Sequence, residues 1–200
     1  MITIRPITKD PLTTLYAINE LSRRAVDGSI KDERVLKHKL ANTSDSSAIA
    51  STNTATNFSV NRTLSYSMFQ PGRVFNLKAN GVYSTTGTPT LTFQIRYGST
   101  VLLAFSAKTG INNASNQGWA IEADLVVRST GASGTLMCAG TVRINTSAGV
   151  DTIETVVNNA ATTVDTLTTA NLQVNLTWSA NSASNTSTLK SLIVSFSDYP

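Results

Sequence analysis

The chain has 200 residues, a formal net charge of +4, one cysteine and one histidine. A single cysteine excludes an intrachain disulfide, and the cysteine and histidine together supply too few ligands for a structural zinc site. No stretch approaches the roughly 18 apolar residues of a membrane-spanning helix, so no membrane partner is expected. The first ten residues lack the apolar core of a secretory signal peptide, and we therefore expect synthesis in a cytoplasm.

Charge falls abruptly near residue 41. The first 40 residues contain 13 of the 28 charged side chains, eight basic and five acidic, whereas the remaining 160 contain only 15. Because acidic residues are interleaved with the basic ones, a solvated or docking helix is favoured over a nucleic-acid-binding face, and no nucleic-acid partner is expected. A charged arm joined to a long, weakly charged body is typical of an attachment segment that carries a displayed domain.

The arm, residues 1–40, is patterned for short helices. Asp10 is a good N-cap and Pro11 a good first helical residue, and Gly28 ends the apolar periodicity that follows them. A second short helical pattern spans residues 30–40. Helices of this length are marginal in water, so each needs another surface. We expect an apolar stripe and two arginines at its rim to dock on a partner chain, through Leu12, Leu15, Ile18, Leu21, Arg23 and Arg24.

Residues 41–57 are almost free of large apolar side chains, which predicts a polar linker or an extended strap. From Phe58 the apolar period becomes two, most clearly in the run TLTFQIRY at residues 90–97. Turn clusters separate about eight or nine such runs, which predicts a mainly β, antiparallel jelly-roll sandwich of about eight strands over residues 58–200. The expected core residues are Phe93, Ile95, Trp119, Ile121, Leu125 and Trp178.

The sequence contains no catalytic signature such as G-x-S-x-G or a phosphate-binding loop. Glu122 and Asp124 lie two apart on a predicted strand and therefore share one face. Such a pair can hydrolyse glycosides, or bind calcium when other oxygen ligands join it, but a charged strip that discourages edge pairing is the favoured interpretation. Cys138 fits a buried position and His38 a surface or interface position. We therefore expect no enzyme, no cofactor and no metal site.

Two stretches of the body resemble a domain found in virion structural proteins of tailed bacteriophages. They are NGVYSTTGTPTLTFQIRYGSTVLLAFSA and GWAIEADLVVRSTGASGTLMCAGTVRI. The similar features are an alternating strand followed by R-Y-G, a Gly-Trp pair that opens the strand ending near Arg128, and the R-S-T-G-A-S-G-T turn of residues 128–135. The resemblance covers roughly residues 72–195 and leaves out the arm, which varies among such proteins and sets where the domain attaches.

The resemblance implies a homotrimer without enzymatic activity, located in the virion after synthesis in the host cytoplasm. We expect a capsid decoration (cement) or head-fibre protein whose arm docks on the major capsid protein or another virion protein and whose jelly roll is displayed. The alternative is a tail-fibre or receptor-binding protein that recognises host surface glycans. Glycan sites favour clustered exposed aromatic residues, and most aromatics of the body fit inward positions, so the first interpretation is favoured.

Overall fold

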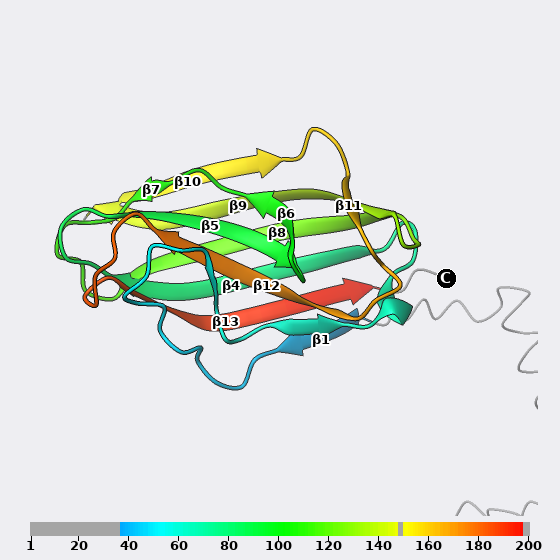
Figure 1. Cartoon of the computed structure of the whole chain (residues 1–200), viewed down its shortest axis with the longest axis horizontal. Coiled ribbons are helices and arrows are strands. Elements are labelled where there is room, and N and C mark those ends of the chain that lie inside the picture. The colour runs from blue at the N-terminus through cyan, green and yellow to red at the C-terminus, as the bar shows by residue number, and fades with distance from the viewer. Residues whose placement is uncertain (1–36, 148–149, 198–200) are drawn as a thin grey trace, which may run out of the picture. The chain divides into compact units, whose positions relative to one another are not determined.

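The computed structural model describes residues 37–147 and 150–197, which form two antiparallel sheets (Figure 1). The seven-stranded sheet has the order β1-β13-β4-β8-β9-β10, with β11 paired to β9. Its strands are β1 (Lys37–Ala41), β4 (Val74–Ser84), β8 (Gln117–Ser129), β9 (Gly134–Ser147), β10 (Val150–Val157), β11 (Thr162–Val164) and β13 (Thr186–Ser197).

The six-stranded sheet has the order β2-β12-β5-β6, with β3 paired to β12 and β7 paired to β5. Its strands are β2 (Thr56–Asn57), β3 (Arg62–Leu64), β5 (Thr90–Tyr97), β6 (Thr100–Ala104), β7 (Lys108–Thr109) and β12 (Ala170–Trp178). One short 3-10 turn, η1 (Tyr66–Met68), lies between β3 and β4.

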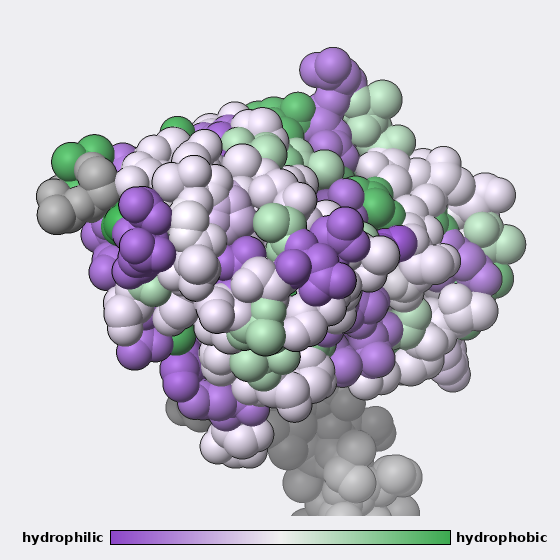
Figure 2. Space-filling model, turned by 60° about the vertical axis from the view of Figure 1, so that its left-hand side comes forward, coloured by the Kyte–Doolittle hydropathy of each residue, from purple (hydrophilic) through white to green (hydrophobic). Residues whose placement is uncertain are grey.

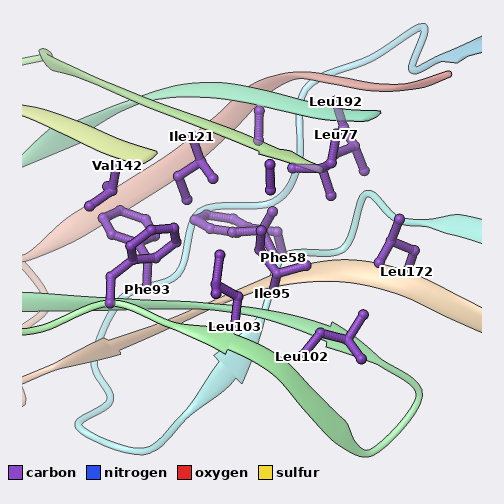
Figure 3. Packing of buried hydrophobic residues seen from close by; sticks show 14 of the residues in the cluster. Phe58, Leu77, Phe93, Ile95, Leu102, Leu103, Ile121, Val142, Leu172 and Leu192 are labelled. Carbon is purple, nitrogen blue, oxygen red and sulfur yellow. The ribbon is translucent and has the colours of Figure 1, made fainter. Parts of the chain in front are cut away.

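The core lies between the sheets and follows the alternation in the sequence. In β5, Leu91, Phe93 and Ile95 are buried, whereas the threonine and glutamine side chains between them face outward. Side chains from both sheets interdigitate around Phe58 and Phe93 (Figure 3). Burial of alternating residues on both inner faces is what stabilises a sandwich. The predicted core is confirmed for all six residues: Phe93, Ile95, Trp119, Ile121, Leu125 and Trp178.

The strand order combines nested pairs with a meander. β4 pairs with β13 in one sheet, and β5 pairs with β12 in the other. Such nesting of early and late strands across two sheets is how a jelly roll wraps. The strands β8, β9 and β10 instead follow one another within the seven-stranded sheet. The predicted mainly β, antiparallel sandwich is confirmed, but the meander of β8, β9 and β10 departs from the nesting of the predicted jelly roll. The described residues form thirteen strands, several of only two or three residues, where about eight were predicted.

The body begins earlier than the sequence pattern predicts. Residues 37–41 are not helical but form β1, which pairs with β13 from Lys37–Ser197 to Ala41–Ile193. A short helix segment has little stability of its own, whereas the open edge of β13 offers a full set of backbone partners. The rest of the predicted helical arm, residues 1–36, lies outside the described residues.

Residues 41–57 are an extended strap on the sandwich and not a free linker. Ile49 is 5% exposed and forms a bridge with Ser187, and its carbonyl accepts a hydrogen bond from Trp178 Nε1 at 3.3 Å. The strap ends in β2, and the next residue, Phe58, stacks on Trp119 with 5.5 Å between ring centroids. Of the two predicted forms, the extended strap is the one present, because one isoleucine among polar residues suffices to anchor the segment.

Candidate interaction surfaces

The residues predicted to dock on a partner lie outside the part of the chain that the structure describes. They are Leu12, Leu15, Ile18, Leu21, Arg23 and Arg24. Within residues 37–147 and 150–197, no helix has the length and apolar character to cross a membrane. The same described residues hold no group of three or more histidine, cysteine or acidic side chains placed to bind a metal ion. The candidate surfaces below all belong to the sandwich.

One end of the sandwich, which we call the entry end, is where β1 begins beside the last residues of β13. η1 and the segment 165–169 lie at this end, because β3 pairs with the start of β12 and Tyr97 Oη donates to the carbonyl of Thr168 at 2.7 Å. Tyr66 and Leu167 are each 60% exposed there. Tyr66 is exposed because the 3-10 turn η1 interrupts the alternation of inward and outward side chains.

The opposite end, which we call the loop end, consists of residues 50–55, 85–89, 110–116 and 179–185. These four segments contain no charged residue and are composed mainly of Asn, Ser, Thr, Ala and Gly. Figure 2 turns this end towards the viewer and shows a mostly pale surface with scattered purple patches. These four segments are therefore polar but uncharged, and the nearest charged pair at this end is Asp151 with Arg143, where β10 begins beside the end of β9.

The segments of the loop end are tied to one another by buried polar side chains. Thr85 Oγ1 donates to the carbonyl of Ile111 and accepts from the amide of Ala114. Asn185 Oδ1 accepts from the amide of Thr86 at 3.0 Å, which joins two loops far apart in sequence. Among the described residues, the non-glycine residues with positive φ also lie in these segments: Ser51, Asn113 and Asn116. Such backbone conformations persist only where neighbouring contacts hold them, so these loops are ordered by their ties.

Glu122 and Asp124 share the outer face of the seven-stranded sheet, as predicted. Lys78 Nζ lies 3.0 Å from Glu122 Oε1, and Asn76 Nδ2 donates to Asp124 Oδ1 at 2.7 Å. β8 is an interior strand between β4 and β9, so these carboxylates do not protect a sheet edge, and that interpretation is wrong. Each carboxylate is held by a neighbour on β4. Among the described residues, no third acidic side chain joins them to form a metal-binding cluster.

A shallow trough runs along the same outer face over β8, β9 and β10. It consists of three adjoining hollows, of which the middle one holds about 330 Å³ and is lined by Ala120, Glu122, Thr141, Arg143 and Ile153. The floor is low where the outward residues of β8 and β9 are small, and the longer side chains of Glu122, Asp124 and Arg143 stand around it. We call this feature the outer trough, and define its floor by Gly118, Ala120, Ala139 and Thr141.

An ion pair closes one edge of the sandwich. Glu154 on β10 lies 2.8 Å from Lys108 Nζ on β7, and it accepts hydrogen bonds from the Ser106 amide at 3.0 Å and the Ser106 hydroxyl at 2.8 Å. The pair is largely shielded, since the side chains are 12% and 22% exposed. Burial by itself would raise the pKa of Glu154, but the hydrogen bonds from Lys108 and Ser106 and the charge of Lys108 outweigh it and lower that pKa.

The remaining candidates for chemistry are buried. Cys138 is fully buried, and burial raises the pKa of its thiol to about 12, so the predicted role as a small hydrophobic residue holds. The body's two tryptophans are also buried, as are Tyr83 and Tyr97. His38 lies in β1, but its side chain is outside the described set.

The sequence analysis did not predict the outer trough, because three strands form it and the sequence does not show their register.

Comparison with known proteins gives matches among solved structures but none among protein families or curated sequences. No protein-family model matches the chain, and no curated protein sequence matches it. A chain in the structure of the infectious bursal disease virus Gx strain matches with 13% identity and a TM-score of 0.32. The match covers 82% of this chain but only 32% of that one, so this chain spans about a third of the viral protein it matches. A TM-score of this size does not establish a shared fold.

Proposed function

We propose that this chain is a non-enzymatic structural component of a virus particle. In this proposal the N-terminal arm attaches the protein to the particle and the sandwich is displayed with its loop end outward. More specifically, we propose a homotrimeric capsid decoration or head-fibre protein of a tailed bacteriophage. This more specific proposal rests on the resemblance of residues 72–195. The arm would bind the major capsid protein or another virion protein.

The observation that carries the proposal is the contrast between the two ends of the sandwich. The chain passes from the arm into β1 at the entry end, where Tyr66 and Leu167 expose apolar side chains. The loop end carries no charge in its four segments, and its loops are tied by Thr85 and Asn185. Exposed apolar side chains favour contact with another surface, whereas a rigid, polar, uncharged end is suited to solvent.

The acidic and thiol groups that were candidates for chemistry are also held in structural contacts or buried. Glu122 is paired with Lys78, Glu154 is paired with Lys108, and the thiol of Cys138 is buried. Catalytic acids and bases usually converge in a cleft and reach a substrate. These groups lie on separate faces or inside the core, which supports a structural role over an enzymatic one.

The ordered loops favour a second candidate, a tail-fibre or receptor-binding protein for host glycans. Ties such as the bond between Asn185 and Thr86 hold amide and hydroxyl groups in fixed positions, and preorganised polar groups lower the entropy cost of binding. Copy number per particle discriminates best, because hundreds of copies indicate a shell protein, whereas a few to a few dozen indicate a tail part or a sparse fibre. A glycan array with the intact protein tests the second candidate directly.

The attachment is tested by incorporation into particles. The full chain, a Leu15→Asp/Leu21→Asp variant and a matched Thr13→Asp/Ala17→Asp variant are each supplied to particles that lack the protein, and bound copies are counted by quantitative mass spectrometry. The stripe variant should bind at least ten-fold less than the full chain, whereas the Thr13→Asp/Ala17→Asp variant, whose positions lie off the stripe at helical spacing, should bind normally. Normal incorporation of the stripe variant would refute the arm as the anchor.

A further inference from the structure

We propose that one hollow of the outer trough, which we call the slot, binds a single neutral sugar unit, such as the end unit of a host surface glycan. The inference deepens the second candidate function and rests on it, because it names the site. The slot lies where β8 begins, next to the loop end, and holds about 180 Å³. Pockets for larger ligands hold roughly 300–1,000 Å³, so this one suits a single ring. Its outward residues are Asn80, Gly118, Ala120, Arg143, Asn145 and Asp151.

The strand register gives the slot two polar walls with a low floor between them. Asn80 on β4 lies opposite Ala120 on β8, and Ala120 lies opposite Arg143 on β9. The next row places Asn145 of β9 beside Asp151 of β10. The walls on β4 and β9 are therefore two strands apart, about 10 Å. A ring that lies on the floor can reach hydrogen-bonding groups on both sides.

The floor is open because β8 carries a glycine that neither its backbone nor its packing requires. Gly118 is not one of the described glycines with positive φ, and a Cβ added there meets nothing within 4 Å. Glycine weakens a strand, and in a strand it often marks a place where a ligand approaches the backbone closely. Gly118 leaves such an approach free from the solvent side.

The polar groups of the slot have hydrogen-bonding capacity that the protein does not use. Asn145 Oδ1 is shielded from solvent and accepts no hydrogen bond from any described residue. A shielded acceptor without a donor costs free energy, so a ligand hydroxyl that donates to it is favoured. Arg143 Nε lies 3.6 Å from Asp151 Oδ2, farther than the roughly 2.7–2.9 Å of a tight charge-assisted bond. Both groups can therefore also bind a ligand.

The charges of the slot cancel, and this decides the class of ligand. Arg143 carries one positive charge and Asp151 one negative charge, while the two asparagines are neutral. A phosphate or an ammonium group would be repelled by one member of the pair as it is attracted by the other. Hydroxyl groups donate and accept, as carboxamides do, so neighbouring hydroxyls on one ring match all four side chains. A neutral sugar meets this description.

The slot is held in place by buried groups beneath it. Tyr83 Oη donates to the carbonyl of Asn145 and accepts from the amide of Ile111 at 3.3 Å, which ties the slot to the loop end. Trp119 is 3% exposed, and its Nε1 donates to Ser187 Oγ at 3.0 Å. Its ring is buried and offers no face for stacking, so recognition depends on hydrogen bonds. Fixed groups lower the entropy cost, but one exposed ring should still bind weakly, with a Kd of about 1 mM. Many copies on a particle would multiply such weak contacts.

The test is sugar binding by the full-length protein in solution. Saturation-transfer NMR with the methyl glycosides of galactose, glucose, mannose and N-acetylglucosamine should show binding of at least one of them, and titration gives its Kd. Gly118→Leu fills the floor and should weaken that binding at least about ten-fold. Asn145→Ala removes the shielded acceptor and should weaken it about five-fold. Unchanged melting curves show that each variant is folded.

Asn80 and Asn76 provide a matched pair of variants. They lie two residues apart on β4 and share the outer face, but only Asn80 lines the slot. Asn80→Ala should weaken sugar binding about five-fold. Asn76→Ala loses only the bond to Asp124 and should bind the sugar as the wild type does. Equal Kd values for the two variants would contradict the assigned wall.

The outcomes separate the slot from the function beneath it. Sugar binding that Gly118→Leu, Asn145→Ala and Asn80→Ala all leave unchanged overturns the slot and leaves a glycan-binding protein standing, with its site elsewhere. Methyl glycosides represent linked sugars, so binding of free reducing sugars alone overturns a glycan as the ligand. Stronger binding of inorganic phosphate than of any glycoside overturns the neutral class. Absence of binding both in NMR and on the glycan array overturns the slot and the second candidate function together. Incorporation into particles is measured separately, so none of these results decides the virion role.

Discussion

Replacing Glu154 by glutamine should weaken the sandwich measurably, because Glu154 joins β10 of one sheet to β7 of the other. At neutral pH the variant loses the charge that Lys108 pairs with, 2.8 Å away, and weakens two hydrogen bonds from Ser106. The pair is partly buried, so its contribution lies between those of exposed and fully buried ion pairs. We expect Glu154→Gln to cost about 1–2 kcal/mol of unfolding free energy. In a domain of this size that lowers Tm by about 2–8 °C.

The chain offers a matched control for this effect. Glu122 is also paired with a lysine at 3.0 Å, but the side chains of Lys78 and Glu122 are 58% and 65% exposed. Exposed pairs contribute little, so Glu122→Gln should change the unfolding free energy by less than about 0.5 kcal/mol. A double-mutant cycle with Lys108→Met isolates the interaction energy of the shielded pair from other effects of each substitution.

The contribution of Glu154 to stability should also depend on pH, and the direction follows from its pKa shift. The pKa of Glu154 is lowered in the folded state by the hydrogen bonds from Lys108 and Ser106. Its stabilisation is therefore fully present above the unfolded-state pKa, about 4.3, and is lost as the pH falls through the lower folded-state pKa. The difference between wild type and Glu154→Gln should shrink between about pH 5 and pH 3. Equal melting temperatures at pH 7, or a difference that grows on acidification, would refute the reasoning.

The other predictions concern the core and the boundary of the body, and thermal melting measures each of them. Phe93→Ala should cost about 3–5 kcal/mol, because Phe93 is 1% exposed between the sheets. Gly81→Ala should cost about 1–3 kcal/mol, since an added Cβ meets the Trp119 ring and the Thr188 carbonyl, whereas Gly118→Ala, which meets nothing within 4 Å, should be nearly neutral. A chain that starts at Leu36 should have the same melting temperature as the full chain. A chain that starts at Ser59 loses the buried Ile49 and Phe58 and should be destabilised by at least about 5 kcal/mol. Equal melting temperatures for the two shortened chains would contradict the assigned boundary.

Local alternation predicted the core because a strand buried on one face repeats every two residues. Phe93 and Ile95, and likewise Trp119 and Ile121, are recognisable without any knowledge of their partners. The shared face of Glu122 and Asp124 follows from the same period. Whether their strand is interior or at an edge depends on the order of strands, which local pattern does not contain. The edge-protection hypothesis failed for that reason.

The segments that were mispredicted depend on contacts far along the chain. β1 is a strand because it lies beside β13, about 150 residues later in sequence, and the pattern of KHKL alone suits either a helix or a strand. Ile49 is one apolar residue in a polar run, and only its position opposite Ser187 makes it part of the core. For the outward residues of β10 a signal did exist, because Ile153, Thr155 and Val157 alternate with Thr152, Glu154 and Val156 in VDTIETVV.

The antiparallel architecture allows the two ends of the sandwich to serve different purposes. β4 begins at the entry end and finishes at the loop end, while β13 runs the opposite way beside it, so the turns between strands collect at one end or the other. The loops of one end can therefore change without disturbing contacts at the other, provided that Thr85 and Asn185 keep their buried hydrogen bonds. Substitutions at exposed positions of residues 179–185 should then alter what the loop end presents and leave attachment unaffected. If the loop end recognises a glycan, its specificity resides in those exposed positions, and the tie residues act only by holding them in place.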